Sequence, residues 1–259
     1  MILDKIAMQR RIQLENEIES LDRESARSQA LNCKRPLYSL KAALKQPTLS
    51  VIAEVKKASP SKGLIREDFR PVEFALEYQS AGANAISCLT EENYFQGSND
   101  YLDEITKNVT IPVLRKDFVI DEYQIYHART LGASAVLLIC AILDKQTLVR
   151  FTDIAHSIGL EVLMEVHNET ELETALLTNA DVLGINNRDL KDFTVDLDTT
   201  ARLSALVPDD KVLVSESGIR DNNDMKTARR NGADAVLIGE TLMRADSITS
   251  ALMTLREGV

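Results

Sequence analysis

The sequence is poor in cysteine and histidine and has no long apolar run. Its three cysteines, Cys33, Cys88 and Cys140, show no CxxC spacing, and an odd number forms no complete disulfide framework. We therefore expect free thiols and a cytosolic protein. The three histidines are too scattered to predict a metal site. No apolar run reaches the roughly 18 residues that span a membrane, and the first residues lack the apolar core of a signal peptide.

Basic residues are outnumbered by acidic ones. The 40 acidic and 30 basic side chains give a net charge of -10. This charge repels nucleic acid and anionic lipid, so we expect neither as a partner. With 259 residues, 44% of them hydrophobic, the chain is long enough for one large core. We expect a single domain over residues 1–259 and take a monomer as the starting expectation.

Residues 1–47 have a polar, helical pattern. Apolar positions recur at helical spacing from Asp4 to about Leu21, and Pro36 interrupts the pattern. Ser39 is placed to start a short second helix that runs through Leu44. We expect an N-terminal helical extension that packs on the body of the protein.

From residue 48 onward, short apolar runs rich in β-branched residues alternate with stretches of helical spacing. The eight runs cover residues 49–55, 84–89, 110–114, 134–140, 160–166, 181–186, 211–215 and 234–239. Such runs are typical of parallel strands buried on both faces. Eight strand–helix units predict a closed (β/α)8 barrel, the TIM barrel.

An open doubly wound sheet is the alternative fold. It would require a glycine-rich turn after the first strand, and residues 56–63 match that turn poorly. A weak internal repeat also favours the barrel, because Gly82, Gly132, Asn179 and Gly232 recur about every 50 residues before small residues and a predicted strand.

Charged and amide side chains close most of the predicted strands. In barrel enzymes the chemistry lies at the carboxyl ends of the strands. Side chains alternate along a strand, so Glu54 and Lys56 share the inner face. The alternation does not decide between Arg115 and Lys116. We expect Glu91, Glu92 and Lys62 to be solvated loop charges. The polar strand ends that predict a site are Glu54, Lys56, either Arg115 or Lys116, Glu165, Asn186, Glu216 and Ser217.

The last two strand ends carry a phosphate-binding pattern. Ser217 and Gly218 follow the seventh strand, and Gly239 and Glu240 follow the eighth. Glycines there expose backbone N–H groups to an anion, at the usual barrel phosphate site. The pattern predicts a small phosphorylated substrate. The Glu240 carboxylate would repel phosphate, so we expect only its backbone N–H to contribute.

Five motifs together resemble the indole-3-glycerol-phosphate synthase family of tryptophan biosynthesis. They are residues 54–61, 114–118, 164–167, 184–190 and 215–219, and the resemblance extends over the whole chain. It implies ring closure of 1-(2-carboxyphenylamino)-1-deoxyribulose 5-phosphate to indole-3-glycerol phosphate, with release of CO₂ and water. It implies no metal and no organic cofactor. The chain is similar to the monofunctional members, which lack a fused isomerase domain.

The same resemblance implies roles for individual residues. Lys116 would be the general acid and Glu165 would exchange protons during dehydration. Glu54 would stabilise positive charge on the anilino nitrogen, and Lys56 would hold sugar or carboxylate oxygens. The remaining implied contacts are Asn186 and Glu216 with hydroxyls, Ser59 and Arg188 with the anthranilate carboxylate, Phe118 with the ring, and Ser217, Gly218, Gly239 and Glu240 with phosphate. The family pattern has serine where this chain has Glu240.

Two other functions are compatible with parts of the pattern. A Schiff-base aldolase also requires a lysine inside a phosphosugar barrel. A phosphate-binding module without catalysis would keep the glycines but lose the acid and the base, which this chain retains. We expect Ser59 to Gly63 to form a mobile loop over the pocket, with Pro60 restricting its conformations.

Overall fold

The eight apolar runs form eight parallel strands that close into a barrel. The computed structural model describes residues 2–189 and 193–259. The strands are β1 (Ser50–Val55), β4 (Ala85–Leu89), β5 (Val113–Lys116), β6 (Ala135–Ile139), β7 (Glu161–Val166), β8 (Val182–Asn186), β9 (Val212–Glu216) and β10 (Ala235–Ile238). Each strand pairs with the next, and β1 pairs with both β4 and β10, which completes the ring. The predicted TIM barrel is confirmed, and the open sheet is excluded.

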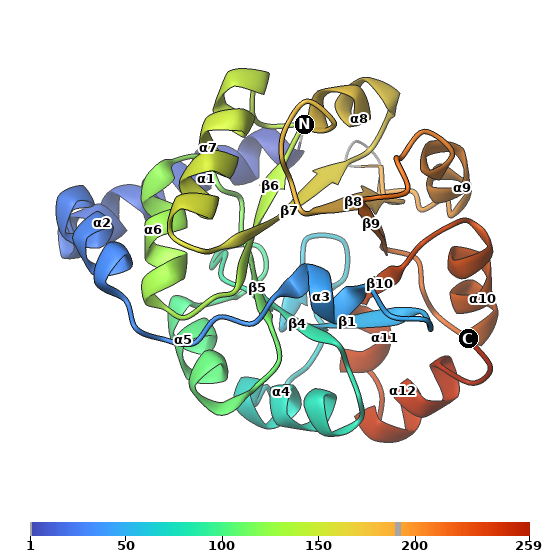
Figure 1. The fold of residues 1–259 in the computed structure, drawn as a ribbon. Helices are drawn as coiled ribbons and strands as arrows, with labels where there is room; N and C mark the ends of the chain where they lie inside the picture. Colours follow the sequence, from blue (N-terminus) through green and yellow to red (C-terminus); the bar gives the residue numbers. More distant parts are fainter. Residues whose placement is uncertain (1, 190–192) are drawn as a thin grey trace.

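Helices follow the strands and form the outer layer (Figure 1). They are α4 (Pro71–Ser80), α5 (Asn99–Asn108), α6 (Glu122–Thr130), α7 (Lys145–Ser157), α8 (Glu169–Ala175), α9 (Asp198–Ser204), α10 (Asn222–Arg230), α11 (Glu240–Met243) and α12 (Ile248–Leu255). Several begin at a side-chain cap, as at Asp121, Asp144 and Asp221, which accept backbone N–H groups of the first turn. In the described parts of the chain, every helix is too short or too polar to cross a bilayer.

The N-terminal extension forms three helices, α1 (Ile2–Ser20), α2 (Arg23–Asn32) and α3 (Leu40–Leu44). Helix α2 packs against α6 on the outside of the barrel. Helix α3 lies across the ring of strands in Figure 1, and Leu40 and Leu44 join the inner barrel core. Ser39 caps α3 as the sequence predicts. The extension therefore packs on the barrel as expected.

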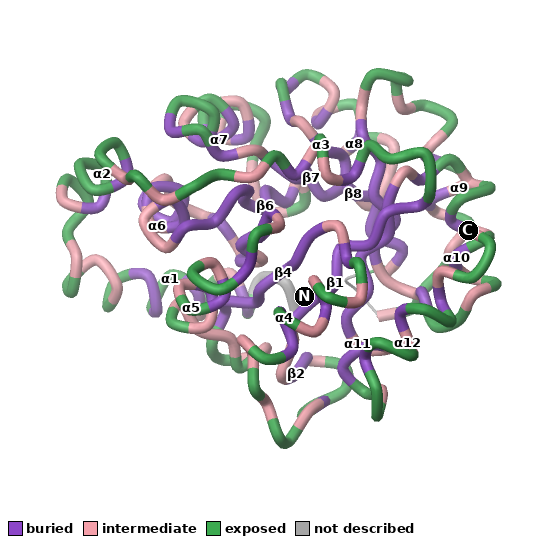
Figure 2. Tube along the Cα trace, turned by 60° about the horizontal axis from the view of Figure 1, so that its bottom comes forward, coloured by how far each residue is buried: buried purple, intermediate pink, exposed green. Residues whose placement is uncertain are grey.

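Two apolar clusters hold the barrel together. The larger lies between the strands and the surrounding helices, and the smaller fills the barrel interior with residues such as Ile52, Leu114 and Leu163. Figure 2 shows the strands as a buried centre inside a partly exposed layer of helices. The apolar interior leaves the polar side chains for the carboxyl ends of the strands.

Three local predictions differ from the structure. Helix α2 was not predicted, since only two helices were expected in residues 1–47. The third strand runs from Val113 rather than over 110–114, because Pro112 has no N–H for the strand ladder. The expected loop from Ser59 to Gly63 begins and ends in a small antiparallel hairpin of β2 (Ala58–Ser59) and β3 (Gly63–Leu64). Leu190, the last residue of the fourth family motif, lies outside the described residues.

Candidate active site

A cavity of about 580 Å³ lies at the carboxyl ends of the strands. Its lining brings together residues that are far apart in the sequence. All of the predicted site residues line it: Glu54, Lys56, Ser59, Lys116, Phe118, Glu165, Asn186, Arg188, Glu216, Ser217, Gly218, Gly239 and Glu240. The predicted geometry, in which strand ends converge on one mouth, is therefore observed.

Lys116 lies between two carboxylates at the centre of this cavity. Its Nζ is 3.0 Å from Glu165 and 3.3 Å from Glu216. Burial alone would lower the pKa of the Lys116 ammonium, but Glu165, Glu216 and Glu54 outweigh burial and raise that pKa well above its usual value. The group therefore stays protonated between these carboxylates. Arg115, the neighbour that alternation could not separate from Lys116, points away from the cavity.

A second ion pair lies at the carboxyl end of β1. Lys56 Nζ is 2.6 Å from Glu54 Oε1, so the two residues share the inner face as predicted. Gly239 explains how the pair fits, because a Cβ there would lie 2.3 Å from Glu54 Oε1 and 2.9 Å from Lys56 Nζ. The glycine predicted for phosphate binding is thus also required to leave space for these two side chains.

Glu216 depends on a glycine in the same way. A Cβ on Gly184 of β8 would lie 2.2 Å from Glu216 Oε1. Burial raises the pKa of Glu216 to about 7, with Glu165 adding to the effect and Lys116 opposing it. Glu216 is therefore able to gain or lose a proton near neutral pH.

The turn after β9 contains two of the residues predicted to bind phosphate. Ser217 and Gly218 both have positive φ, 66° and 94°. Asn187 holds this turn, because its amide donates to the carbonyl oxygens of Glu216 and Ser217 at 3.0 and 3.1 Å. A buried amide next to the site thus supports the predicted phosphate position.

Three cations outside the predicted set of site residues also line the cavity: Lys62, Arg220 and Arg244. Arg244 donates to the carboxylate of Glu240 over 3.0 Å. Lys62 is half exposed and lies 3.9 Å from that carboxylate, in keeping with a solvated loop charge. Glu240 therefore engages Arg244, one of the cations nearest to the expected phosphate.

The apolar side of the cavity includes an aromatic pair. Phe95 and Phe118 have ring centroids 6.0 Å apart, and both line the cavity. Phe95 was not predicted, because its loop resembles no regular element. The expectation that Glu91 is a solvated charge is wrong. Glu91 is fully buried and accepts three backbone N–H groups, including that of Phe95, which fixes the aromatic loop.

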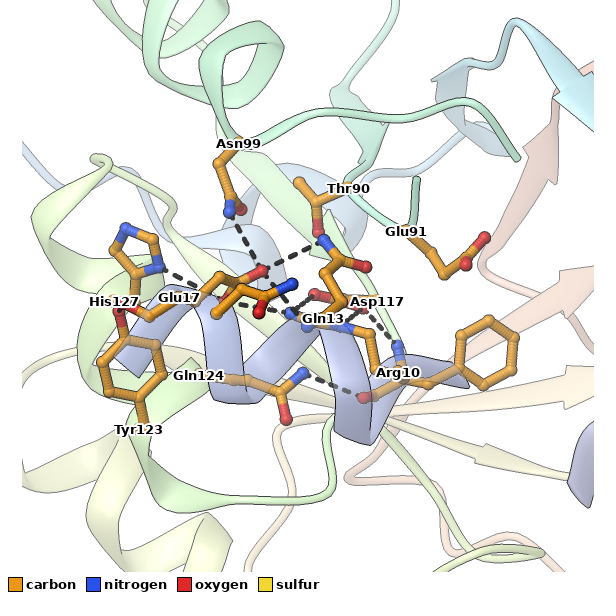
Figure 3. A network of polar contacts seen from close by, with 12 residues as sticks. Arg10, Gln13, Glu17, Thr90, Glu91, Asn99, Asp117, Tyr123, Gln124 and His127 are labelled. Atoms are coloured by element: carbon orange, nitrogen blue, oxygen red, sulfur yellow. Dashed lines mark hydrogen bonds and ion pairs between the residues drawn. The ribbon is translucent and has the colours of Figure 1, made fainter. Parts of the chain in front are cut away.

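A buried polar network joins helix α1 to the end of β5 (Figure 3). Asp117 accepts two hydrogen bonds from Arg10 of α1, at 2.8 and 2.9 Å, and one from Arg115 at 3.0 Å. The Asp117 carboxylate also accepts the backbone N–H of Phe118. Lys116 and Phe118 face the cavity on either side of a residue that α1 holds in place.

Fold and site together define a (β/α)8-barrel cavity with a buried cluster of lysine and glutamate side chains beside the turn at Ser217 and Gly218. The family profile described as "Indole-3-glycerol phosphate synthase" matches residues 3–255. The chain belongs to this family.

Individual relatives agree with that assignment. The chain is 49% identical over 259 residues to an indole-3-glycerol phosphate synthase of Alkaliphilus metalliredigens, covering 100% of this chain and 99% of the relative. It is 48% identical to that of Endomicrobium trichonymphae over 99% and 100% of the two chains. Among solved structures, an N-acetylmannosamine-6-phosphate 2-epimerase from Clostridium perfringens matches with a TM-score of 0.63 at 14% identity, over 82% of this chain and 94% of that one. This last match supports the barrel fold alone.

Proposed function

We propose that this cavity converts 1-(2-carboxyphenylamino)-1-deoxyribulose 5-phosphate to indole-3-glycerol phosphate, CO₂ and water. Family membership and the position of Lys116 between two glutamates carry the proposal. In the first step the ring carbon bonds to the C2' ketone, whose oxygen must gain a proton. Lys116 supplies that proton and polarises the oxygen.

The later steps use the carboxylates. Loss of CO₂ restores the aromatic ring, and a hydroxyl then leaves as water. Glu165 exchanges protons in this dehydration, and Glu54 stabilises positive charge on the anilino nitrogen. Glu54 also holds Lys56 toward the substrate oxygens, while Asn186 and Glu216 orient hydroxyl groups.

We expect the two ends of the substrate to bind to different groups of residues. We place the phosphate on the backbone N–H groups of Ser217, Gly218, Gly239 and Glu240, at the end of the cavity lined by Arg220 and Arg244. We place the anthranilate carboxylate on Ser59 and Arg188, with the aromatic ring against Phe118 and Phe95. The side chain of Arg188 donates to the Phe193 carbonyl oxygen in the ligand-free arrangement, so we expect it to exchange that bond for the carboxylate.

We further propose that the chain acts as one domain, as a monomer in the cytosol, and without a cofactor. Gel filtration with light scattering tests the monomer. Incubation with the carboxyphenylamino substrate, followed by indole fluorescence, tests the activity. Borohydride added during turnover should trap no adduct on Lys56 or Lys116. A trapped adduct would instead favour the Schiff-base aldolase mechanism.

A further inference from the structure

One histidine lies directly behind the proposed acid–base group. His167 follows β7 and is two residues beyond Glu165, so the two side chains lie on the same side of the chain. Its Nε2 is 3.2 Å from Glu165 Oε1, on the side of that carboxylate away from Lys116. The His167 side chain is largely buried and lies against Glu165.

The second ring nitrogen also faces a carboxylate. His167 Nδ1 is 3.0 Å from Glu171 Oε2 at the start of α8. The backbone N–H of His167 donates to the same oxygen at 2.9 Å. Asn168 donates to the other oxygen of Glu171 at 2.7 Å, so this carboxylate is held in a single position. The ring therefore lies in a line of three groups, Glu171, His167 and Glu165.

An imidazole with carboxylates at both nitrogens is stabilised as the cation. Burial by itself would lower the pKa of His167, but Glu165 and Glu171 outweigh burial and raise it to about 10. Other groups facing this line are Lys116 from β5, Asn186 from β8 and Glu216 from β9, all around Glu165. Cys140, which follows β6, is uncharged, because burial raises its thiol pKa to about 12.

We propose that His167, held by Glu171, is a positioning residue that orients Glu165 and keeps it a carboxylate between proton transfers. Asn186 and His167 both approach Glu165 Oε1, which leaves Oε2 for Lys116 and the substrate. A nearby cation lowers the proton affinity of Glu165, so a proton that Glu165 picks up is passed on readily. This inference rests on the proposed role of Glu165.

The test compares five variants by steady-state kinetics over a range of pH. For His167→Gln we expect kcat to fall about 10- to 100-fold with KM within about twofold. We expect the acid limb of kcat/KM to move up by about one pH unit, because Glu165 loses its cationic neighbour. Glu171→Gln should lower kcat and raise the acid limb as well, but by smaller amounts. The double variant His167→Gln with Glu171→Gln should have the same kcat and acid limb as His167→Gln alone, since Glu171 acts through His167.

His156→Gln is the matched control. His156 pairs with Asp181 at 2.8 Å on the outer helix α7, so the same substitution there should leave the pH profile unchanged. A purely structural role for His167 would lower the unfolding temperature without moving the acid limb, and that result would overturn the proposal. If His167→Gln does not fold, the test uses Glu171→Gln, and an acid limb that does not move in this variant overturns the proposal.

Glu165→Gln distinguishes the proposed role of Glu165 from the proposed role of His167. Normal activity in Glu165→Gln would refute the role of Glu165 itself, whereas an inactive Glu165→Gln with an unchanged His167→Gln profile would refute only the positioning role.

Discussion

Arg10 and Asp117 form a two-bond ion pair, 2.8 and 2.9 Å long, between residues 107 positions apart. Both side chains are fully buried. Asp117 lies between the two cavity residues Lys116 and Phe118, so helix α1 is joined directly to the strand end that carries the proposed acid. The pair therefore links the N-terminal extension to the strand end that carries Lys116.

Arg10→Met should destabilise the protein by about 3 kcal/mol, because it removes one partner of a buried ion pair. Asp117 still accepts a hydrogen bond from Arg115 in this variant, which limits the loss of stability. We expect kcat to fall at the same time, since Lys116 and Phe118 lose a fixed neighbour. Urea unfolding and steady-state rates measure the two effects.

Arg129→Met is the control for the Arg10 variant. Arg129 is another buried arginine, and it donates to the backbone carbonyl oxygens of Cys33 and Arg35. Its loss should loosen the same extension without touching β5. Equal loss of kcat in both variants would show that the extension acts through general stability and would contradict a specific role for the Arg10–Asp117 pair.

Gly184→Ala should reduce activity and also stability, because the new Cβ would lie 2.8 Å from Leu163 Cδ2 in the barrel core. The new Cβ would lie 2.2 Å from Glu216 Oε1, so the Glu216 side chain must move away from Lys116. We expect kcat to fall at least about tenfold, a change of about 1.4 kcal/mol in the barrier. Gly258→Ala is the control, because it has a positive φ but no atom within 4 Å of a new Cβ. Activity of Gly184→Ala equal to that of the control would argue against a precise position for Glu216.

Stability should depend on pH through Glu216. Burial raises the pKa of Glu216 to about 7 from an ordinary value of 4.5. The folded state therefore binds one more proton than the unfolded state between these values, and this contribution to stability decreases as pH rises from about 4.5 to 7. Glu216→Gln mimics the protonated side chain. We expect it to be more stable than the parent at pH 8 by about 1–3 kcal/mol and similar at pH 5. A difference that is the same at both pH values would contradict the raised pKa.

Glu240→Ser should strengthen binding at the phosphate end. Glu240 holds Arg244 by a 3.0 Å hydrogen bond and brings a negative charge near the anion site. Its removal frees Arg244, and we expect inhibition by inorganic phosphate to tighten about three- to tenfold. The double variant Glu240→Ser with Arg244→Gln should lose this gain. Unchanged inhibition in the single variant would place the phosphate away from Glu240.

Apolar runs that alternate with stretches of helical spacing predicted the barrel. Each strand of a barrel is buried on both faces, so it appears in the sequence as a continuous apolar run. The same logic located Glu54, Lys56, Glu165 and Glu216, since a charge at the end of a buried strand has only the cavity to face. Arg115 and Lys116 could not be separated, because both are basic and Pro112 obscures where the strand begins.

Other parts of the site depend on contacts between distant segments and have no local signature. Glu91 is followed by polar loop residues, and only the fold of that loop around its carboxylate buries it. Arg10 lies on a polar helix, and its partner Asp117 is over a hundred residues away. Gly184 lies inside a strand rather than in a turn, so the sequence gives no reason for a glycine there. The reason is that a side chain at this position would collide with Glu216 on the neighbouring strand.

The rate at which Lys116→Ala forms indole-3-glycerol phosphate tests the proposed chemistry most directly. The variant removes the ammonium that lies between Glu165 and Glu216. With the fold retained by circular dichroism and substrate saturating, we expect single-turnover product formation to fall by about 10³-fold or more. A rate within about tenfold of the parent would contradict Lys116 as the proton donor.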